Sequence, residues 1–300
     1  MSTVEETQVH AEIEELFDQR SWWARTRDLA AKNPLGAFGA AVVIGMIILA
    51  VFAQQLTGFD PESNSFETML VPPGLDFWLG TDQMGRDIWT RIVYGARTAL
   101  FVGFTCAFVG AFIGLVLGVG SAYFSGKIDL IFQRIMDVFM AFPLIIMALA
   151  VVSIFGTGTQ NVIIAITIPF IPRCARVVRS NALAIREIPY VDAARALGYS
   201  HMRIILRHMA PNVMAPFLIM LTAFLGQAIL LEASLSYLGL GVQEPTPAWG
   251  LMLQGGAEEY VESAPWVAVF PGLAITVAVF GFNLFGDSVR DTLDPRLRSQ

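Results

Sequence analysis

Residues 98–126, TALFVGFTCAFVGAFIGLVLGVGSAYFSG, contain no Lys, Arg, Asp or Glu. Because a helix rises 1.5 Å per residue, about 20 apolar residues cross the roughly 30 Å hydrocarbon core of a bilayer. Charged residues are also absent from 33–59, 138–172, 213–231, 233–243 and 263–286. The pattern predicts a polytopic membrane protein of the all-α class.

The composition of the whole chain agrees with this interpretation. Of its 300 residues, 55% are hydrophobic and 15% are charged, whereas about 25% are charged in an average soluble domain. These values exclude a soluble enzyme, a disordered chain and a secreted disulfide scaffold. We expect Cys106 and Cys174 to be small buried thiols rather than a disulfide pair. Residues 1–35 show no secretory signal pattern, so we expect the first span to direct insertion.

Six transmembrane helices are predicted. The stretch 138–172 is too long for one crossing, and its centre at 156–161 holds glycines and polar residues that break helices. It therefore forms two spans joined by a tight hairpin. The second of these contains Pro169 and Pro172 and is expected to continue as a helix beyond the bilayer. The other four spans are predicted at 35–53, 98–124, 213–238 and 265–286.

The basic residues predict the orientation, about which the net charge of −6 says little. With both termini cytoplasmic, sixteen Lys and Arg residues lie on the inner side and three on the outer side, as the positive-inside rule requires. We divide the chain into a cytoplasmic amphipathic segment (1–33), transmembrane helix 1 (34–56), an extracytoplasmic segment (57–97), a five-helix core (98–290) that contains a cytoplasmic loop (179–212), and a cytoplasmic tail (291–300).

The cytoplasmic loop 179–212 carries signals for two short helices. Pro189 suits the first turn of one helix, and Gly198 suits its left-handed end. Ser200 is a favourable N-cap for a second helix, which we expect to end before Pro211.

The side chains of this loop indicate a docking element. Ala193 and Ala194 leave the first helix thin enough to enter a groove, and Arg195, Arg203 and Arg207 surround it with positive charge. Two alternatives are a DNA-reading helix-turn-helix and a basic helix pair on anionic lipid. Attachment to a span at each end obstructs docking on DNA, so no nucleic-acid partner is expected.

The loop resembles a known motif. Asp192-Ala193-Ala194, followed by three residues, Gly198, nine residues and His208-x-Ala210-Pro211, is similar to Glu-Ala-Ala-x3-Gly-x9-Ile-x-Leu-Pro. That motif marks the permease subunits of ATP-binding-cassette (ABC) importers. The sequence departs from it at three positions, Asp192, His208 and Ala210, of which the last two lie outside the Ala-Ala-x3-Gly part.

Further segments extend the resemblance over roughly residues 20–297. They resemble the dipeptide/oligopeptide/nickel branch of these importers, and specifically the second permease of its usual pair. The segments are Asn33-Pro34-Leu35, Trp78 to Asp87, Leu231 to Gly241, Pro245-x-Pro247-x-Trp249-Gly250 and Asp291-x-Leu293-Asp294-Pro295-Arg296. The resemblance implies the type I ABC importer permease fold.

The resemblance also implies function and partners. A coupling helix would sit in a cleft of a cytoplasmic ATPase, and its residues would be Tyr190, Val191, Asp192, Ala193, Ala194, Arg195, Leu197 and Gly198. The partners would be a homologous second permease, two ATPase subunits or domains and an extracytoplasmic solute-binding protein, in the bacterial plasma membrane. ATP and magnesium would bind the ATPase partners, so this chain would hold no cofactor and would not be an enzyme. The cargo would be di- or oligopeptides, or alternatively a nickel chelate, haem or another small solute.

One ionisable residue lies within an otherwise uncharged span. Glu232 is a functional candidate for that reason, and at 1.5 Å per residue from residue 213 it lies about 29 Å along the helix, near the outer boundary. We take Glu232 and the nearby Ser234 as candidates for a pathway or outer gate. A solvated helix end or a packed ion pair remains open for Glu232. We assign Asp137 to a local ion pair with Arg134.

The remaining patterns favour structure over chemistry. A ridge of small residues in 103–122 predicts close helix packing, within this chain rather than with a partner. Residues 121–128 fail as a phosphate loop, and the three histidines are too dispersed for a metal site. We interpret the acids of 57–97 as a solvated face on a cap over the pathway entrance, and 9–31 as an interfacial helix on membrane lipid. An ion-coupled secondary transporter would need inverted repeats and midplane ion ligands, and neither is visible.

Overall fold

The computed structural model describes residue 31 and residues 33–293. The predicted interfacial helix at 9–31 and most of the 291–300 tail therefore lie outside the described residues. Within the described part the regular elements are all helices, loops fill most of 57–87 and 238–248, and the one extended pairing there is an isolated bridge between Thr81 and Asp87. The all-α class is confirmed.

Eleven α-helices are described, with short 3-10 turns at Phe66–Thr68 and Ala210–Val213 and a π-turn at Ile205–Met209. They are α3 (Pro34–Val51), α4 (Ala53–Leu56), α5 (Ile88–Phe124), α6 (Gly126–Met140), α7 (Leu144–Phe155), α8 (Thr159–Arg186), α9 (Pro189–Ala196), α10 (His201–Ile204), α11 (Met214–Tyr237), α12 (Trp249–Glu259) and α13 (Trp266–Leu293).

The described helices account for the six predicted spans. Five helical stretches are long and apolar enough to cross a bilayer: α3, α5, α8, the continuous run from α10 to α11, and α13. The pair α6 and α7 supplies a sixth if it is counted as one broken span, because its two halves bend by 89°. The predicted span beginning at 138 is therefore not straight. Pro143 separates its halves, since proline lacks an N–H and disfavours helical geometry in the preceding residue.

Two boundaries in the middle of the chain behave as expected. Gly156 and Gly158, with φ of +87° and +115°, form the predicted hairpin between α7 and α8. α8 then continues through Pro169 and Pro172 to Arg186, as predicted.

α5 begins earlier than predicted, at Ile88 rather than near residue 98. The cause is local, because the Asp87 carboxylate accepts hydrogen bonds from the Thr90 N–H at 2.8 Å and the Thr90 hydroxyl at 2.6 Å. This is an N-cap. Arg91 and Arg97 interrupt the apolar pattern, but Arg97 donates to the Ala50 and Val51 carbonyls at the end of α3, where unpaired carbonyls attract a cation.

The small-residue ridge of α5 packs within the chain, as predicted. Gly110, Gly114 and Gly118 face α8 so closely that added Cβ atoms would lie 2.8 Å from the Phe170 Cβ, 2.6 Å from the Cys174 Cβ and 2.6 Å from the Ala175 carbonyl oxygen. Even alanine would separate the two helices there. Cys106 and Cys174 are buried free thiols beside this seam, as expected.

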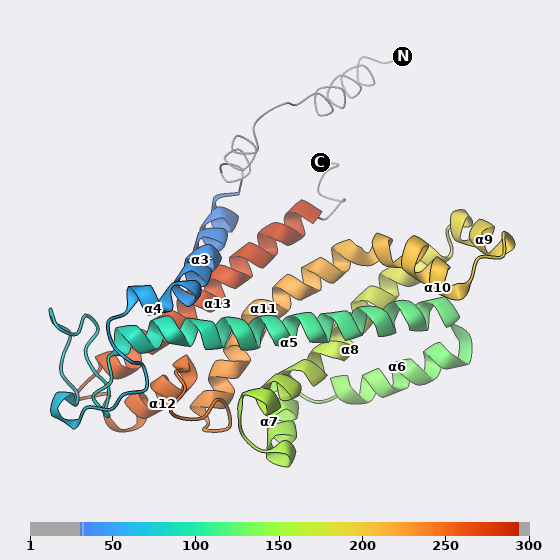
Figure 1. Ribbon diagram of the computed structural model, residues 1–300. Coiled ribbons are helices and arrows are strands. Elements are labelled where there is room, and N and C mark those ends of the chain that lie inside the picture. Colours follow the sequence, from blue (N-terminus) through green and yellow to red (C-terminus); the bar gives the residue numbers. More distant parts are fainter. Residues whose placement is uncertain (1–30, 32, 294–300) are drawn as a thin grey trace.

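The long α5 sets the axis of the molecule (Figure 1). The loops that precede it gather at one end, and α9 and α10 lie at the other end. α3 runs alongside α13, where an added Cβ at Gly281 would lie 2.3 Å from the Val42 side chain. The fold thus separates two loop regions by the full thickness of the helical bundle.

Candidate functional site

α9 has the ends that the sequence predicts. Pro189 occupies its first turn. At the other end the Gly198 N–H donates to the Arg195 carbonyl at 2.9 Å, and the Tyr199 N–H donates to the Ala194 carbonyl at 3.2 Å. With φ of +76° at Gly198, these bonds form a Schellman motif.

The second helix of the loop continues further than predicted. α10 begins after Ser200, whose carbonyl accepts from the Ile204 N–H at 3.1 Å, although the Ser200 side chain makes no capping bond. The helix does not end before Pro211. It passes through the π-turn at Ile205–Met209 and the 3-10 turn at Ala210–Val213 directly into α11. These irregular turns accommodate a proline, which cannot donate the regular helical bond.

The two alanines of the motif face opposite ways. Ala194 is 5% exposed and packs in the same core as Val191 and Ile204, which are fully buried or nearly so. Ala193 is exposed. The interpretation that both alanines thin the helix for a groove is therefore wrong for Ala194, which seats α9 on its own chain.

An exposed apolar surface covers the end of this loop. We call it the apolar tip, and its residues are Ile188, Tyr190, Leu197, Met202 and Leu206. Leu197 is the most exposed of them, at 73%. Large apolar side chains exposed close together in one loop are a feature of protein or membrane contact sites.

Polar contacts brace the loop against the spans. The Tyr190 hydroxyl donates to the His208 carbonyl at 3.0 Å and accepts from the Asn212 amide at 3.1 Å. The Tyr123 hydroxyl at the end of α5 pairs with His201 Nδ1 at 2.6 Å. The loop therefore moves with α5 and α11. Asp192 and Arg195 make an exposed ion pair at 2.8 Å, a class of pair that contributes little to stability.

At the opposite end of the molecule, the buried residues Asp82, Arg86 and Arg91 form an ion cluster with the exposed Glu244. Arg86 donates from Nε to Asp82 at 2.7 Å and from Nη1 to Glu244 at 2.7 Å. Arg91 is fully buried, 3.8 Å from Asp82 and 3.6 Å from Glu244, and donates to the Pro61 carbonyl at 2.9 Å. The cluster joins the 57–87 loops to the segment that precedes α12.

Arg86 is the well-paired cation of this cluster, whereas Nε and Nη2 of the buried Arg91 have no hydrogen-bond partner among the described residues. Burial by itself lowers the pKa of the Arg86 guanidinium. The hydrogen bond to Glu244 and the charge of Asp82 raise that pKa by more than burial lowers it, so the net shift is upward. Asp82 also accepts from the backbone N–H groups of Met84 and Arg86 at 2.9 and 3.0 Å. The prediction that the acids of 57–97 form a solvated face is wrong for Asp82 and Asp87, which are 4% and 6% exposed.

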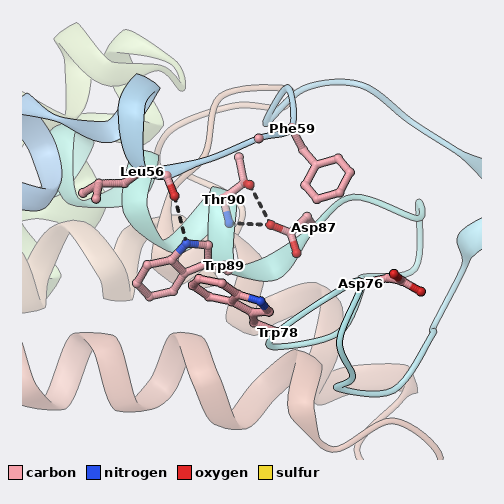
Figure 2. A pocket seen from close by; sticks show the side chains of 8 residues that line it. Leu56, Phe59, Asp76, Trp78, Asp87, Trp89 and Thr90 are labelled. Carbon is pink, nitrogen blue, oxygen red and sulfur yellow. Dashed lines mark hydrogen bonds between the residues drawn. The ribbon is translucent and has the colours of Figure 1, made fainter.

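Figure 2 shows a small pocket of about 180 Å³ beside this cluster, lined by aromatic residues and two carboxylates. Asp87 is occupied by its bonds to Thr90, and Asp76 points away from it. The Trp89 indole donates to the Leu56 carbonyl at 3.4 Å. With one carboxylate engaged as a helix cap and the other turned outward, the pocket offers no acid–base pair, so we interpret it as part of the cap.

Comparison with known proteins identifies the chain. Residues 110–299 match the family described as "Binding-protein-dependent transport system inner membrane component". Residues 21–73 match the "N-terminal TM domain of oligopeptide transport permease C". The chain belongs to this family of importer permeases. The predicted resemblance to a peptide-type ABC importer permease is confirmed, and the permease is a multi-pass membrane protein.

Relatives of the permease match it over nearly their whole length. The dipeptide transport system permease protein DppC of Alkalihalophilus pseudofirmus is 41% identical over 95% of this chain and 94% of its own. The glutathione transport system permease protein GsiD of Escherichia coli O6:K15:H31 is 41% identical over 92% and 90%. The inward-facing MetNI methionine ABC transporter has a chain of the same fold, with a TM-score of 0.55 and 22% identity over 69% of this chain and 98% of that one. Family membership implies an ATPase and other partner subunits.

The two gate candidates of the permease lie on different faces of α11. Glu232 is 1% exposed and accepts a hydrogen bond from the Ser236 hydroxyl at 2.7 Å, which in turn accepts from the Val242 N–H at 3.1 Å. Among the described residues it has no ion-pair partner, so neither a solvated helix end nor a packed ion pair describes it. Ser234 is partly exposed and donates to the Leu230 carbonyl.

The ion pairs between α6 and α8 differ from the one predicted. Asp137 pairs with Arg176 of α8 and not with Arg134. One turn further along α8, Arg179 donates to Asp129 of α6, and this second pair also ties α6 to α8. The described residues contain no group of acids, histidines or cysteines that could hold a metal ion.

Sequence reasoning missed two features of the permease. It counted Arg86 and Arg91 only as outer charges, although their spacing beside a glycine-rich turn could have suggested a shared partner. It counted Arg173 with the inner basic residues, although this arginine directly follows a proline-marked span and lines a cavity between helices.

Proposed function

We propose that this permease subunit moves di- or oligopeptides across the bacterial plasma membrane as part of an ABC importer. The observation that carries the proposal is the match over nearly the full length to relatives named for dipeptide and glutathione transport. A nickel chelate, haem and an ion-coupled mechanism gain no support from these relatives. Both termini are cytoplasmic in this proposal, which the sixteen-to-three distribution of basic residues supports.

The proposed complex contains a homologous second permease, two ATPase subunits or domains and an extracytoplasmic solute-binding protein. ATP and magnesium bind the ATPase partners, which hydrolyse ATP, and this chain does no chemistry. The solute-binding protein delivers cargo to the side on which the 57–87 loops lie, and the ATPase binds at the side on which α9 lies.

Coupling to ATP hydrolysis is proposed to pass through residues 190–198. The apolar tip supports this, because α9 exposes Ala193 and Leu197 while Val191 and Ala194 hold it to the core. α8 and α11 enter and leave the same loop, so a force applied at the tip acts on two spans at once. Closure of the ATPase would then move these spans together.

The substrate is tested by uptake in a deletion strain of the source bacterium. Loss of this gene should abolish accumulation of a radiolabelled dipeptide or tripeptide, and a plasmid copy should restore it. Normal uptake of both peptides in the deletion strain would refute the peptide assignment.

The coupling surface is tested in the purified complex. Leu197→Asp and Ala193→Arg should lower recovery of the ATPase with the permease, because the first places charge on the apolar tip and the second on the exposed side of α9. Leu75→Asp is the matched control, since Leu75 is 97% exposed but lies in the 57–87 loops. Recovery equal to wild type for both tip variants would show that the ATPase binds elsewhere.

A further inference from the structure

A cavity of about 360 Å³ lies among α8, α11 and α13. Three polar side chains line it, Arg173 from α8, Gln227 from α11 and Asn283 from α13, and the rest of the lining is apolar or glycine. Two of the lining residues, Ala223 and Leu230, are exposed, so the cavity opens on the face of α11 that also carries Ser234.

The position of Arg173 along α8 places the cavity within the thickness of the membrane. Arg173 is fourteen residues along α8 from Thr159, or about 21 Å at 1.5 Å per residue. If α8 enters the hydrocarbon core at its first residue, the guanidinium lies roughly two-thirds of the way across a 30 Å core. Ionisable groups at such depth are costly, and they mark solute or ion pathways.

Arg173 differs from the next arginines on α8. Arg176 pairs with Asp137 and Arg179 pairs with Asp129. Arg173 has no carboxylate partner among the described residues, and it donates to the Gln227 amide oxygen at 3.3 Å. Its charge is therefore held in the cavity by one long bond to a neutral group.

The neighbouring amide is equally unengaged. The Asn283 side chain makes no hydrogen bond to the described part of the chain, and it lies over Gly226, where an added Cβ would be 2.6 Å from its Oδ1. Gly226 thus leaves room for Asn283 beside the cavity. A guanidinium with two amides matches a carboxylate and its adjoining peptide group, because the guanidinium fork binds carboxylate oxygens in pairs.

We propose that Arg173 binds the C-terminal carboxylate of a transported peptide on its way through the permease, with Gln227 and Asn283 contacting the adjoining peptide group. The inference rests on the proposed function, since it assigns a step of peptide transport. The size of the cavity suits one end of a peptide, because small-molecule sites begin at roughly 300 Å³. A lipid phosphate or a carboxylate of the second permease could meet the same charge, and the experiment separates these.

The test uses the complete importer, reconstituted in liposomes with its ATPase and solute-binding protein. The probes are trialanine and trialanine amide, which differ in the C-terminal carboxylate, and initial uptake rates are compared at equal measured loading of the binding protein. The wild-type importer should take up trialanine faster than trialanine amide. Arg173→Gln should lower the acid-to-amide ratio roughly tenfold, the size expected for one charged hydrogen bond, and Arg173→Lys should keep most of it.

Arg176→Gln is the matched control, since Arg176 lies on the same helix but pairs with Asp137 outside the cavity. It should leave the ratio unchanged. An equal loss of uptake for both peptides in Arg173→Gln, with ATPase stimulation intact, would overturn the inference and leave the proposed function standing. Reduced recovery of the second permease with Arg173→Gln, or reduced binding of anionic lipid with an unchanged peptide ratio, would overturn it as well. Absence of uptake of either peptide by the wild-type complex would overturn the proposed function and the inference together.

Discussion

At the N-terminal end of α5, buried Asp82, Arg86 and Arg91 form an ion cluster with Glu244 that joins loops together, whereas at the other end the loop around α9 exposes the apolar tip. In the cluster, the side chains of Asp82, Arg86 and Arg91 are at most 6% exposed, and Glu244 contacts both arginines from the surface. The tip leaves apolar surface uncovered and carries its one ion pair, Asp192 with Arg195, on the outside. The first construction joins loops through buried charges, and the second is the surface that we propose binds a partner. Four substitutions test whether this contrast is real.

The largest effect is expected from Asp82→Asn. The change removes the buried one of the two carboxylates that contact both Arg86 and Arg91, and it leaves buried Arg91 with Glu244 at 3.6 Å, whose side chain is 41% exposed. Breaking a buried ion pair on one side costs about 3–5 kcal/mol. Thermal unfolding of the purified permease in detergent should show a free energy of unfolding that is lower than wild type by this amount. Asp76→Asn is the control, because Asp76 is an exposed acid in the same loops, and it should leave the stability unchanged. A loss of stability below about 1 kcal/mol for Asp82→Asn would show that the ion cluster does not hold these loops together.

The next effect is expected from Ala194→Arg. Ala194 packs beside Val191 and Ile204 in the core, so a guanidinium there would be overpacked and desolvated, at about 2–3 kcal/mol. Hydrogen exchange of 189–213 should become faster. Ala193→Arg is the matched control, because the same side chain on the exposed alanine should leave exchange at the wild-type rate. Equal exchange in the two variants would mean that α9 is not seated by its inner face.

Much of the fold could be predicted because each signal was local. Uncharged runs of membrane length located the spans, and glycine and proline located the hairpin at 156–158 and both ends of α9. The start of α5 could not be predicted in the same way. Asp87 caps α5 in a chain that the bridge between Thr81 and Asp87 has folded back on itself. In the sequence, the arginines that follow Asp87 are typical of a loop outside the membrane.

The sequence predicted where the candidate site lies along the chain, but not which of its side chains are exposed. The spacing of the motif located α9, but it could not say that Ala194 turns inward and Ala193 outward, since that depends on packing against α10 and the π-turn. The ion cluster was invisible for a similar reason: Arg86 and Glu244 are 158 positions apart. Arg173 was assigned by charge alone, because depth in the membrane follows from where α8 begins.

A smaller effect is expected from Gly198→Val. The residue has φ of +76°, and an added Cβ would meet nothing within 4 Å, so the penalty comes from the backbone alone and amounts to about 1 kcal/mol or more. The C-terminal end of α9 should become less ordered. The transport rate should fall clearly, whereas the thermal stability of the whole permease should change little. Gly198→Asn provides the control, since asparagine tolerates the left-handed region. If asparagine and valine impair transport equally, the bulk of the side chain matters and not the conformation.

The smallest effect is expected from Asp192→Asn, which repeats at the apolar tip the substitution made at Asp82. Asp192 pairs with Arg195 at 2.8 Å, but its side chain is 66% exposed, and exposed pairs contribute about 0–1 kcal/mol. Thermal unfolding should therefore barely change, and the small remaining difference should shrink in high salt because exposed charges are screened. The two Asp→Asn variants form a direct comparison, since the chemistry is the same and only burial differs. A loss at Asp192 as large as the loss at Asp82 would show that the tip is held by its charges, and it would then be a fixed structural element rather than a surface prepared for a partner.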